Sequence, residues 1–445
     1  MKRSLPVVAV IGRPNVGKST FFNRILGRRV AIVEDMPGVT RDRNFARAEW
    51  GGRAFYLVDT GGLETESDEP MAVAIRQQVM AAIEESDVIV FLVDGKAGPH
   101  PVDYRIAEHL RRTDRPVILV VNKLDRLPEE LGHHDFWALG LGEPLPVSAL
   151  SGKGSGEVLD AIVSRLPEVE GEEPDDALYV AVIGKPNVGK SSLVNRLIGE
   201  ERMVVTDVAG TTRDSVDTPL RYHGRTLVFI DTAGLRRQSR IEPGLEFYSA
   251  LRTERSIERA DVCLLVIDAT EPLHAQDLRI AQKAWEAGCG LILVANKWDL
   301  VEKDARTATA YEAHIHERAP WLRSVPVVFT SALTGQRVRR TLDLILAVAA
   351  ERSRRVPTHE VNEVVQALVE RQPPPHYRGQ PVKVYYATQA ESAPPTFVIF
   401  VNHPEGITEN YERFLLNGFR ERWGFTGSPL RLRVRRRREK RGEQS

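Results

Sequence analysis

The sequence predicts an α/β protein with two copies of one domain, each a mostly parallel sheet flanked by helices, and a smaller α+β domain at the end. The chain has 445 residues, which suggests about three domains at roughly 150 residues each. A ten-residue stretch, Ile11–Thr20, recurs as Ile183–Ser192, 172 positions later. Apolar runs alternate with helical patterns in both copies, which is typical of parallel sheets covered on both faces.

Five apolar runs in the first copy predict its strands. They span 6–11, 54–58, 88–93, 117–121 and 144–147. Gly51 and Gly52 precede the second run and predict a hairpin with one antiparallel edge strand. Phe21, Phe22, Ile25 and Leu26 share one face of a predicted helix that ends at Gly27.

The repeat fixes the expected domain boundaries. Residues 168–176 contain six carboxylates and no basic residue, which predicts an extended, self-repelling linker. We therefore expect one repeat at 1–167 and the other at 177–351, followed by a third domain at 352–436 and a basic tail at 437–445. In the third domain the pattern predicts helices at 360–371 and 407–422 and strands at 382–387, 396–402 and 430–434.

The composition predicts a folded protein of the cytoplasm. Hydrophobic residues make up 42% and charged residues 27% of the chain, which excludes wholesale disorder. No apolar run approaches the roughly 20 residues that a membrane helix needs, so we expect no membrane contact. The two cysteines, Cys263 and Cys289, are too few for a disulfide scaffold and are expected to be buried apolar side chains.

The formal net charge of zero conceals a segregation of charge. Lys and Arg together number 61, as do Asp and Glu. Residues 351–445 hold 17 basic and 11 acidic side chains, and the excess comes from residues 431–445. The average charge of zero argues against a nucleic-acid partner, but this distribution of charge allows one.

The repeated stretch fits the phosphate-binding loop between a strand and a helix. Its glycines let backbone N–H groups surround a phosphate, and the helix N-terminus adds a favourable dipole. The lysine would neutralise phosphate oxygens, and the serine would ligate Mg²⁺. The expected phosphate-binding residues are Gly12, Arg13, Pro14, Asn15, Val16, Gly17, Lys18, Ser19 and Thr20, and Gly184, Lys185, Pro186, Asn187, Val188, Gly189, Lys190, Ser191 and Ser192.

Two further motifs complete the expected Mg²⁺ and γ-phosphate site. Asp59-x-x-Gly62 and Asp231-x-x-Gly234 each follow an apolar strand, so the carboxylate can assist Mg²⁺ and the glycine N–H can contact the γ-phosphate. Thr40 and Thr212 lie between lysine and aspartate, where a switch loop would lend a hydroxyl to Mg²⁺. A plain loop role for these threonines stays open, and Thr211 competes with Thr212.

The Asn-Lys-x-Asp motifs predict guanine as the base. Asp125 and Asp299 can accept hydrogen bonds from guanine N1–H and the 2-amino group, which adenine lacks. The asparagines and lysines would address the other edge and the plane of the base. Backbone N–H groups of Ser148-Ala149-Leu150 and Ser331-Ala332-Leu333 would face guanine O6. These residues are Asn122, Lys123, Ser148 and Ala149 in the first copy and Asn296, Lys297, Ser331 and Ala332 in the second.

Leucine stands where Ras-like GTPases place a water-orienting glutamine. These residues are Leu63 and Leu235. We therefore expect slow intrinsic turnover and hypothesise that K⁺, held by Asn15 and Asn187, supplies positive charge; the alternative is that these asparagines only stabilise the loop. The expected catalytic residues are Lys18, Lys190, Thr40, Thr212, Asn15 and Asn187.

Two such GTPase domains, an acidic linker and a small third domain resemble the bacterial tandem GTPase family Der, also called EngA, over essentially the whole chain. The resemblance implies hydrolysis of GTP to GDP coupled to late assembly of the large ribosomal subunit, with nucleotide-dependent domain rearrangement and rRNA contact. It also implies a KH-like third domain, Mg²⁺ as cofactor and a monomer in the cytoplasm.

Other functions remain in competition at this point. A membrane-remodelling or metabolic nucleotide enzyme, a tRNA-modification GTPase and a nucleotide-gated binding module share parts of the pattern. In the third domain, Gly424-x-x-Gly427 matches the RNA-clamping loop of KH domains, but its place between a helix and a strand favours a turn.

Overall fold

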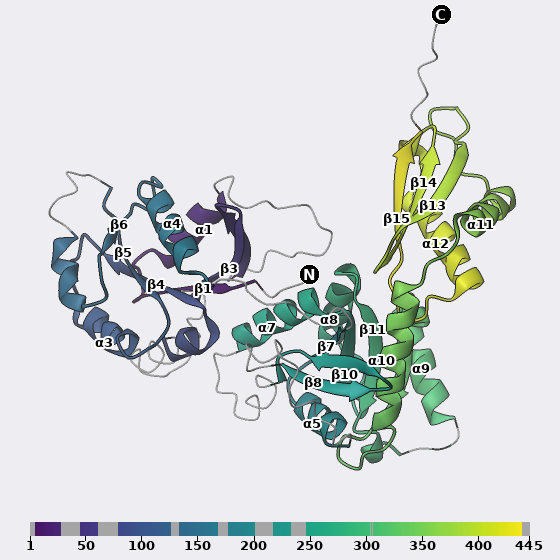
Figure 1. Cartoon of the computed structure of the whole chain (residues 1–445), viewed down its shortest axis with the longest axis horizontal. Helices are drawn as coiled ribbons and strands as arrows, with labels where there is room; N and C mark the ends of the chain where they lie inside the picture. The colour runs from purple at the N-terminus through teal and green to yellow at the C-terminus, as the bar shows by residue number, and fades with distance from the viewer. Residues whose placement is uncertain are drawn as a thin grey trace, which may run out of the picture. The chain divides into compact units, whose positions relative to one another are not determined.

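The computed structural model describes residues 5–27, 45–60, 79–125, 133–167, 177–200, 217–232, 246–302, 304 and 306–437 (Figure 1). The chain divides into two compact units: residues 3–171 with 240–255, and residues 172–239 with 256–445. The second repeat and the third domain therefore share a unit. The expected linker at 168–176 and tail residues 438–445 lie outside the described residues.

The first repeat is a six-stranded sheet with helices on both faces (Figure 1). The strands run in the order β2-β3-β1-β4-β5-β6, and only the edge strand β2 is antiparallel to its neighbour. The predicted hairpin is confirmed, with Gly51 and Gly52 at φ 56° and 77° in its turn. The elements are β1 (Val7–Ile11), α1 (Lys18–Gly27), β2 (Phe45–Trp50), β3 (Arg53–Asp59), β4 (Val88–Asp94), α3 (Pro101–Leu110), β5 (Val117–Asn122), a 3-10 helix (His134–Leu139), β6 (Leu145–Pro146) and α4 (Ser155–Arg165).

Alternate residues of each central strand pack on opposite faces of this sheet. Val8 and Val10 of β1 lie in a core with α1 and α4, whereas Ala9 and Ile11 lie in a core with α3. Because both faces are covered, the strands are apolar throughout rather than alternating. Burial of each large apolar side chain contributes about 1.5–3 kcal/mol, which holds the helices on the sheet.

The second repeat has the same topology, with order β12-β11-β10-β7-β9-β8. Both cysteines are buried in its core, as predicted. Its elements are β7 (Ala177–Ile183), α5 (Lys190–Glu200), β8 (Thr218–Tyr222), β9 (Arg225–Phe229), α7 (Glu246–Arg259), β10 (Val262–Asp268), α8 (Ala275–Glu286), β11 (Gly290–Asn296), α9 (Thr307–Arg318), β12 (Val327–Phe329) and α10 (Val338–Ser353), with 3-10 helices at Trp298–Leu300 and Pro320–Ser324.

The third domain has the predicted order of helices and strands. It contains α11 (Thr358–Arg371), β13 (Val384–Ser392), β14 (Pro395–Val401), a 3-10 helix (Pro404–Gly406), α12 (Glu409–Trp423) and β15 (Arg431–Arg436). In its sheet β14 is antiparallel to β13 and parallel to β15. Phe397 and Ile399 of β14 pack with α11 and α12 in a single core. In the described part of the chain, no helix has the length and apolar character of a membrane span.

The Gly424–Gly427 loop of the third domain docks on the second repeat. Gly427 donates its N–H to the Ser324 carbonyl (2.6 Å) and accepts from the Leu291 N–H at the start of β11 (2.7 Å). The Phe425 side chain is fully buried, and its N–H donates to Glu351 Oε2 of α10 at 2.8 Å. Phe425 and Gly427 are buried, whereas Gly424 and Thr426 are exposed. The loop is therefore a turn that joins two domains through its backbone, which fits the turn interpretation rather than an RNA clamp.

Candidate functional site

The predicted site residues gather at the carboxyl ends of the parallel strands. Asp59 ends β3, Asp94 ends β4 and Asn122 ends β5, while α1 begins at Lys18 after the phosphate loop. Asp94 lies beside Asn122 in the parallel pairing of β4 and β5. Ligands of open α/β sheets bind at this edge, so the topology brings motifs that are more than 100 residues apart to one place.

The phosphate loop depends on backbone conformations that few residues adopt. Asn15 and Asn187 have φ of 64° and 63°, a left-handed conformation that asparagine tolerates better than most residues. Gly17 has φ 97°, and a Cβ there would lie 2.5 Å from Nδ2 of Asn122. The motif glycine is therefore required by both the turn and the neighbouring asparagine.

The loop lysines fold back over the loop. Lys18 Nζ donates to the carbonyls of Gly12 (2.8 Å) and Arg13 (3.0 Å). Lys190 Nζ donates to the carbonyls of Gly184 (2.8 Å) and Lys185 (2.6 Å). Both side chains are buried, and burial lowers the pKa of Lys190 to about 8. Each ammonium is thus fixed against the first two carbonyls of its loop, where a bound phosphate would stabilise its charge.

Two buried aspartates, which no motif identifies, anchor the second residue of each phosphate loop. Asp103 Oδ1 lies 3.6 Å from Arg13 Nε, and Asp277 Oδ2 lies 3.2 Å from Lys185 Nζ. Asp103 also caps α3 by accepting the His100 N–H at 3.0 Å. Burial raises the pKa of Asp103. The side chains of Arg13 and Lys185 therefore stabilise the loop through these aspartates. A phosphate would be bound by the backbone N–H groups of the two residues.

Asn122 and Asn296 tie the phosphate loop to the Ser-Ala loop. Asn122 Nδ2 donates to the Val16 carbonyl (2.8 Å), and its Oδ1 accepts from the Ala149 N–H (2.9 Å). Asn296 makes the same pair of contacts with Val188 (2.9 Å) and Ala332 (3.0 Å). Of the Ser-Ala-Leu N–H groups that we expected at guanine O6, those of Ala149 and Ala332 therefore donate to asparagine, a contact that sequence spacing could not reveal.

The motif lysines are held by acidic partners at the end of the preceding strand. Lys123 Nζ lies 2.7 Å from Asp94 Oδ2 and donates to the Asn15 carbonyl at 2.6 Å. Lys297 Nζ lies 2.6 Å from Asp268 Oδ2. These ion pairs lower the pKa of both aspartates against the opposing effect of burial, which is the largest single influence. The lysine stems are thereby fixed beside the expected plane of the base.

Asp125 and Asp299, the aspartates that we expect to recognise the base, differ in their surroundings. Asp125 accepts from Ser148 Oγ (2.7 Å) and from Lys96 Nζ (2.6 Å), and these contacts lower its pKa. The second repeat has Thr270 where Lys96 stands in the first, and Thr270 Oγ1 donates to Asp268 instead. Among the described residues, an ion-pairing lysine therefore lies beside Asp125 in the first copy but not beside Asp299 in the second.

The expected Mg²⁺ ligands that the structure describes, the two serines and the two aspartates, have the oxygen atoms that Mg²⁺ requires. Ser19 and Ser191 begin their helices after the loop lysines, and Asp59 is 2% exposed at the end of β3. Hydroxyl and carboxylate oxygens are the ligands that Mg²⁺ prefers. Asp231 adopts φ 54°, and its N–H donates to Asp217 Oδ1 at 2.9 Å. Thr40, Thr211, Thr212, Gly62, Gly234, Leu63 and Leu235 lie outside the described residues.

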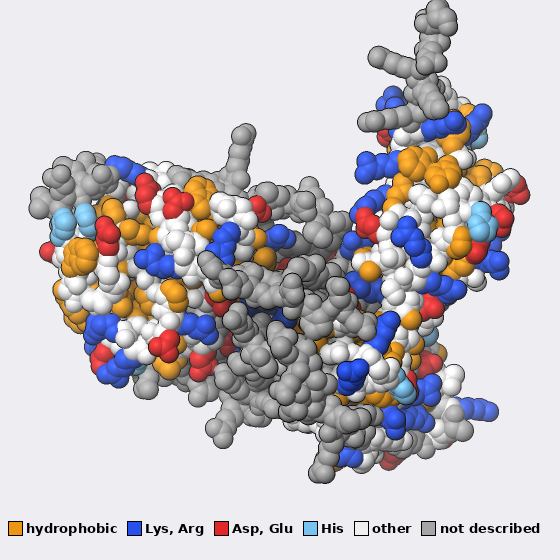
Figure 2. Space-filling model, in the orientation of Figure 1, with side chains coloured by type: hydrophobic (Ala, Val, Ile, Leu, Met, Phe, Trp, Pro, Cys, Tyr) orange, Lys and Arg blue, Asp and Glu red, His pale blue; other side chains and the backbone are white. Residues whose placement is uncertain are grey.

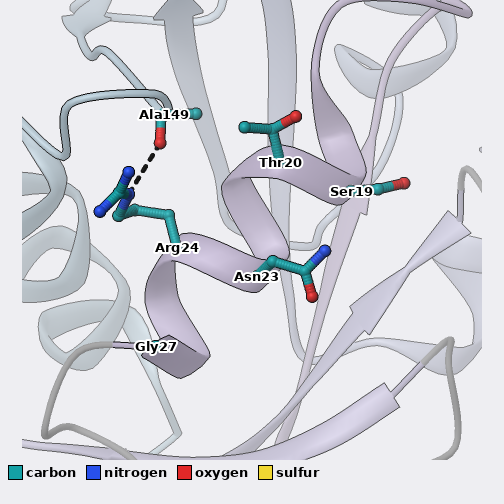
Figure 3. A pocket seen from close by; sticks show the side chains of 6 residues that line it. All are labelled: Ser19, Thr20, Asn23, Arg24, Gly27 and Ala149. Atoms are coloured by element: carbon teal, nitrogen blue, oxygen red, sulfur yellow. Dashed lines mark hydrogen bonds between the residues drawn. The ribbon is translucent and has the colours of Figure 1, made fainter.

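A cavity of about 370 Å³ opens beside the start of α1 (Figure 3). Arg24 crosses one wall, and its Nε donates to the Ala149 carbonyl at 2.9 Å. No motif identified Arg24, although it recurs as Arg196 at the offset of the repeat. Comparison of the two repeats would therefore have identified Arg24 from the sequence. The lining residues are Ser19, Thr20, Asn23, Arg24, Gly27 and Ala149.

The third domain carries basic side chains on one face of its sheet. Arg433 and Arg435 of β15 are exposed and paired in register with Val398 and Phe400 of β14, opposite the core face. Arg431, on the same face, instead donates to the Glu286 carbonyl of the second repeat at 2.8 Å. Arg433 pairs with Glu391 at 2.6 Å. Figure 2 shows Lys and Arg side chains along the edge of the domain where Figure 1 places β15. This face has the charge that an RNA partner would need.

Comparison with known proteins identifies all three domains. The family described as "50S ribosome-binding GTPase" matches residues 7–123 and 179–297. The family described as "KH-domain-like of EngA bacterial GTPase enzymes, C-terminal" matches residues 355–435. The third domain is therefore KH-like, although its Gly-x-x-Gly loop is hydrogen-bonded to a GTPase domain.

Relatives align along nearly the whole chain. The protein named GTPase Der from Gemmatimonas aurantiaca is 58% identical over 97% of this chain and 99% of its own length. GTPase Der from Moorella thermoacetica is 53% identical over 98% of this chain and 99% of its own length. A solved structure of Era with MgGDPNP and part of 16S ribosomal RNA covers 59% of this chain and 93% of its own at 24% identity, with a TM-score of only 0.31. The chain belongs to the GTPase Der family, and it is a GTP-binding and GTP-hydrolysing protein with two GTPase domains.

Proposed function

We propose that this GTPase acts in late assembly of the large ribosomal subunit, as a monomer in the cytoplasm that contacts rRNA. The match of both repeats to GTPases described as 50S ribosome-binding carries the proposal. The basic excess of residues 351–445 and the arginines of β15 support RNA contact. Nucleotide-dependent rearrangement of the domains would couple hydrolysis to binding or release of the particle.

The phosphate site neutralises and orients the triphosphate. Lys18 and Lys190 bring their ammonium groups to the β- and γ-phosphates, and the loop N–H groups surround the β-phosphate. Ser19 with Asp59 and Thr40, and Ser191 with Asp231 and Thr212, would hold Mg²⁺. When bound, Mg²⁺ neutralises charge on the phosphate oxygens. Gly62 and Gly234 would contact the γ-phosphate through their N–H groups.

Base selection is assigned to Asp125 and Asp299. Each carboxylate would accept hydrogen bonds from guanine N1–H and the 2-amino group. A carboxylate facing adenine would lose these partners, at a cost of about 1.5–3 kcal/mol for each charged hydrogen bond. In the first copy the base must also displace Lys96 from Asp125.

We also propose that K⁺ supplies positive charge through Asn15 and Asn187. The left-handed φ of both residues offers a purely structural alternative, and it suggests a sharp test. Asn15→Gly keeps the backbone conformation but removes the side-chain oxygen. If K⁺ assists, the N15G and N187G chain should bind GTP yet lose its preference for KCl over NaCl in a phosphate-release assay. Equal turnover of the unmodified chain in both salts would refute the K⁺ role.

Sedimentation tests the ribosomal proposal. The chain is mixed with ribosomal particles and separated on sucrose gradients with a non-hydrolysable GTP analogue or with GDP. We expect co-sedimentation with large-subunit particles that depends on the nucleotide. Absence from those fractions under both nucleotides would refute the assembly role, while GTP hydrolysis would be unaffected.

A further inference from the structure

The loop that follows β6 has one backbone donor left for the base. In this loop, Ser148–Gly152, the Ala149 N–H donates to Asn122, and the Gly152 N–H donates to the Ser148 carbonyl at 2.7 Å. The Ser151 N–H donates to Ser148 Oγ at 3.1 Å. Among the described residues, no acceptor is found for the Leu150 N–H, and the Leu150 side chain is 70% exposed. The next peptide after Ala149 is thus the one that can donate to guanine O6.

Arg24 holds this same peptide from the other side. Its Nε donates to the Ala149 carbonyl at 2.9 Å (Figure 3). Its Nη2 donates to the Leu150 carbonyl. A trans peptide is planar, so the Leu150 N–H points opposite to the Ala149 carbonyl. Because the Arg24 guanidinium donates to two successive carbonyls, those of Ala149 and Leu150, it fixes the direction of the Leu150 N–H.

We propose that Arg24 is a positioning residue for guanine recognition, which orients the Leu150 N–H toward O6 of the base. The inference rests on the proposed assignment of Asp125 as the base-recognising carboxylate. Arg24 lies on α1, six residues after Lys18. The arginine thereby also fixes the base-binding loop to the helix that begins at the phosphates, so the two halves of the nucleotide site keep their spacing.

The second repeat offers an internal comparison. Arg196 occupies the equivalent position, but its Nη2 donates to the Thr334 carbonyl at 3.2 Å. Its side chain also lies against Gly335, where a Cβ would meet Arg196 Nε at 2.9 Å. Arg196 thus holds the loop one to two residues beyond the peptide that Arg24 holds. We expect Arg196 to affect base recognition less than Arg24 does.

The test compares two nucleotides in the full chain. An Asp299→Ala background removes base recognition from the second site. Binding of GDP is then compared by calorimetry with binding of 6-thioguanosine 5′-diphosphate, which keeps N1–H and the 2-amino group but has sulfur, a weaker acceptor, in place of O6. Arg24→Ala should weaken GDP about tenfold more than the analogue, as expected for one hydrogen bond. Arg24→Lys should restore part of the preference, because a single ammonium can still hold one carbonyl.

The controls separate positioning from stability. Arg105→Ala removes an exposed arginine of α3 and should change neither affinity. Arg196→Ala, in an Asp125→Ala background, should change the preference of the second site by less than about threefold. If Arg24→Ala weakens both nucleotides equally, or leaves both unchanged, Arg24 is only a structural tether and the proposal is wrong. If Asp125→Ala itself leaves GDP binding at the first site intact, the base-site assignment fails instead.

Discussion

Replacing Gly427 by alanine should loosen the joint between the KH-like domain and the second GTPase domain. Gly427 has φ 71°, and a Cβ would lie 2.6 Å from Val348 Cγ2 and 3.0 Å from the Leu291 carbonyl oxygen. A left-handed alanine costs about 1–2 kcal/mol, and overpacking adds about 1–3 kcal/mol. We therefore expect G427A to lower the free energy of unfolding by about 2–5 kcal/mol.

Gly379→Ala is the matched control for this prediction. Gly379 lies in the same domain at φ 77°, but a Cβ there would meet nothing within 4 Å. Its cost should be the conformational part alone, about 1–2 kcal/mol. Urea unfolding followed by tryptophan fluorescence measures both variants. Equal losses for G427A and G379A would refute the argument, because the contact with Leu291 and Val348 would then contribute nothing.

Three further predictions concern the nucleotide sites. Lys96→Ala should tighten GDP binding at the first site up to about fivefold, because an exposed ion pair of about 0.2–1 kcal/mol no longer competes for Asp125; calorimetry showing weaker binding would contradict this. In an Asp125→Ala chain, GDP affinity at the second site should be constant below pH 8 and fall as the pH rises above it. The reason is that the pKa of Lys190 is about 8, and a neutral lysine cannot form an ion pair with phosphate. A constant affinity from pH 7 to 9.5 would contradict this prediction. Asp125→Asn and Asp299→Asn should each abolish GTP binding at one site only, with a loss of about 100-fold or more, and titration of each variant should leave one equivalent of tight binding.

Local sequence patterns predicted the secondary structure well. The apolar runs of the first repeat became β1, β3, β4, β5 and β6, because strands covered on both faces are apolar at every position. The paired glycines at 51–52 predicted the edge hairpin, because only residues that tolerate positive φ fit that turn.

Long-range side-chain contacts could not be predicted from such patterns. Arg24 reaches Ala149 across 125 positions, and Asp103 reaches Arg13 from the start of another helix. Neither pair has a motif, since a salt bridge or a carbonyl clamp needs no fixed spacing. The duplication would have identified both, because Arg24 and Asp103 recur as Arg196 and Asp277. The roles of Thr40, Thr212, Gly62 and Gly234 stay predictions.

Strand β11 connects the two ends of the second GTPase domain mechanically. At its beginning, Leu291 donates to Gly427 of the KH-like domain, and at its end Asn296 donates to Val188 of the phosphate loop. The strand has seven residues, which span about 20 Å, and it is hydrogen-bonded on both sides. A central strand that is hydrogen-bonded on both sides bends little. A displacement of the KH-like domain at Gly427 would therefore be transmitted along β11 to Asn296 and the phosphate loop.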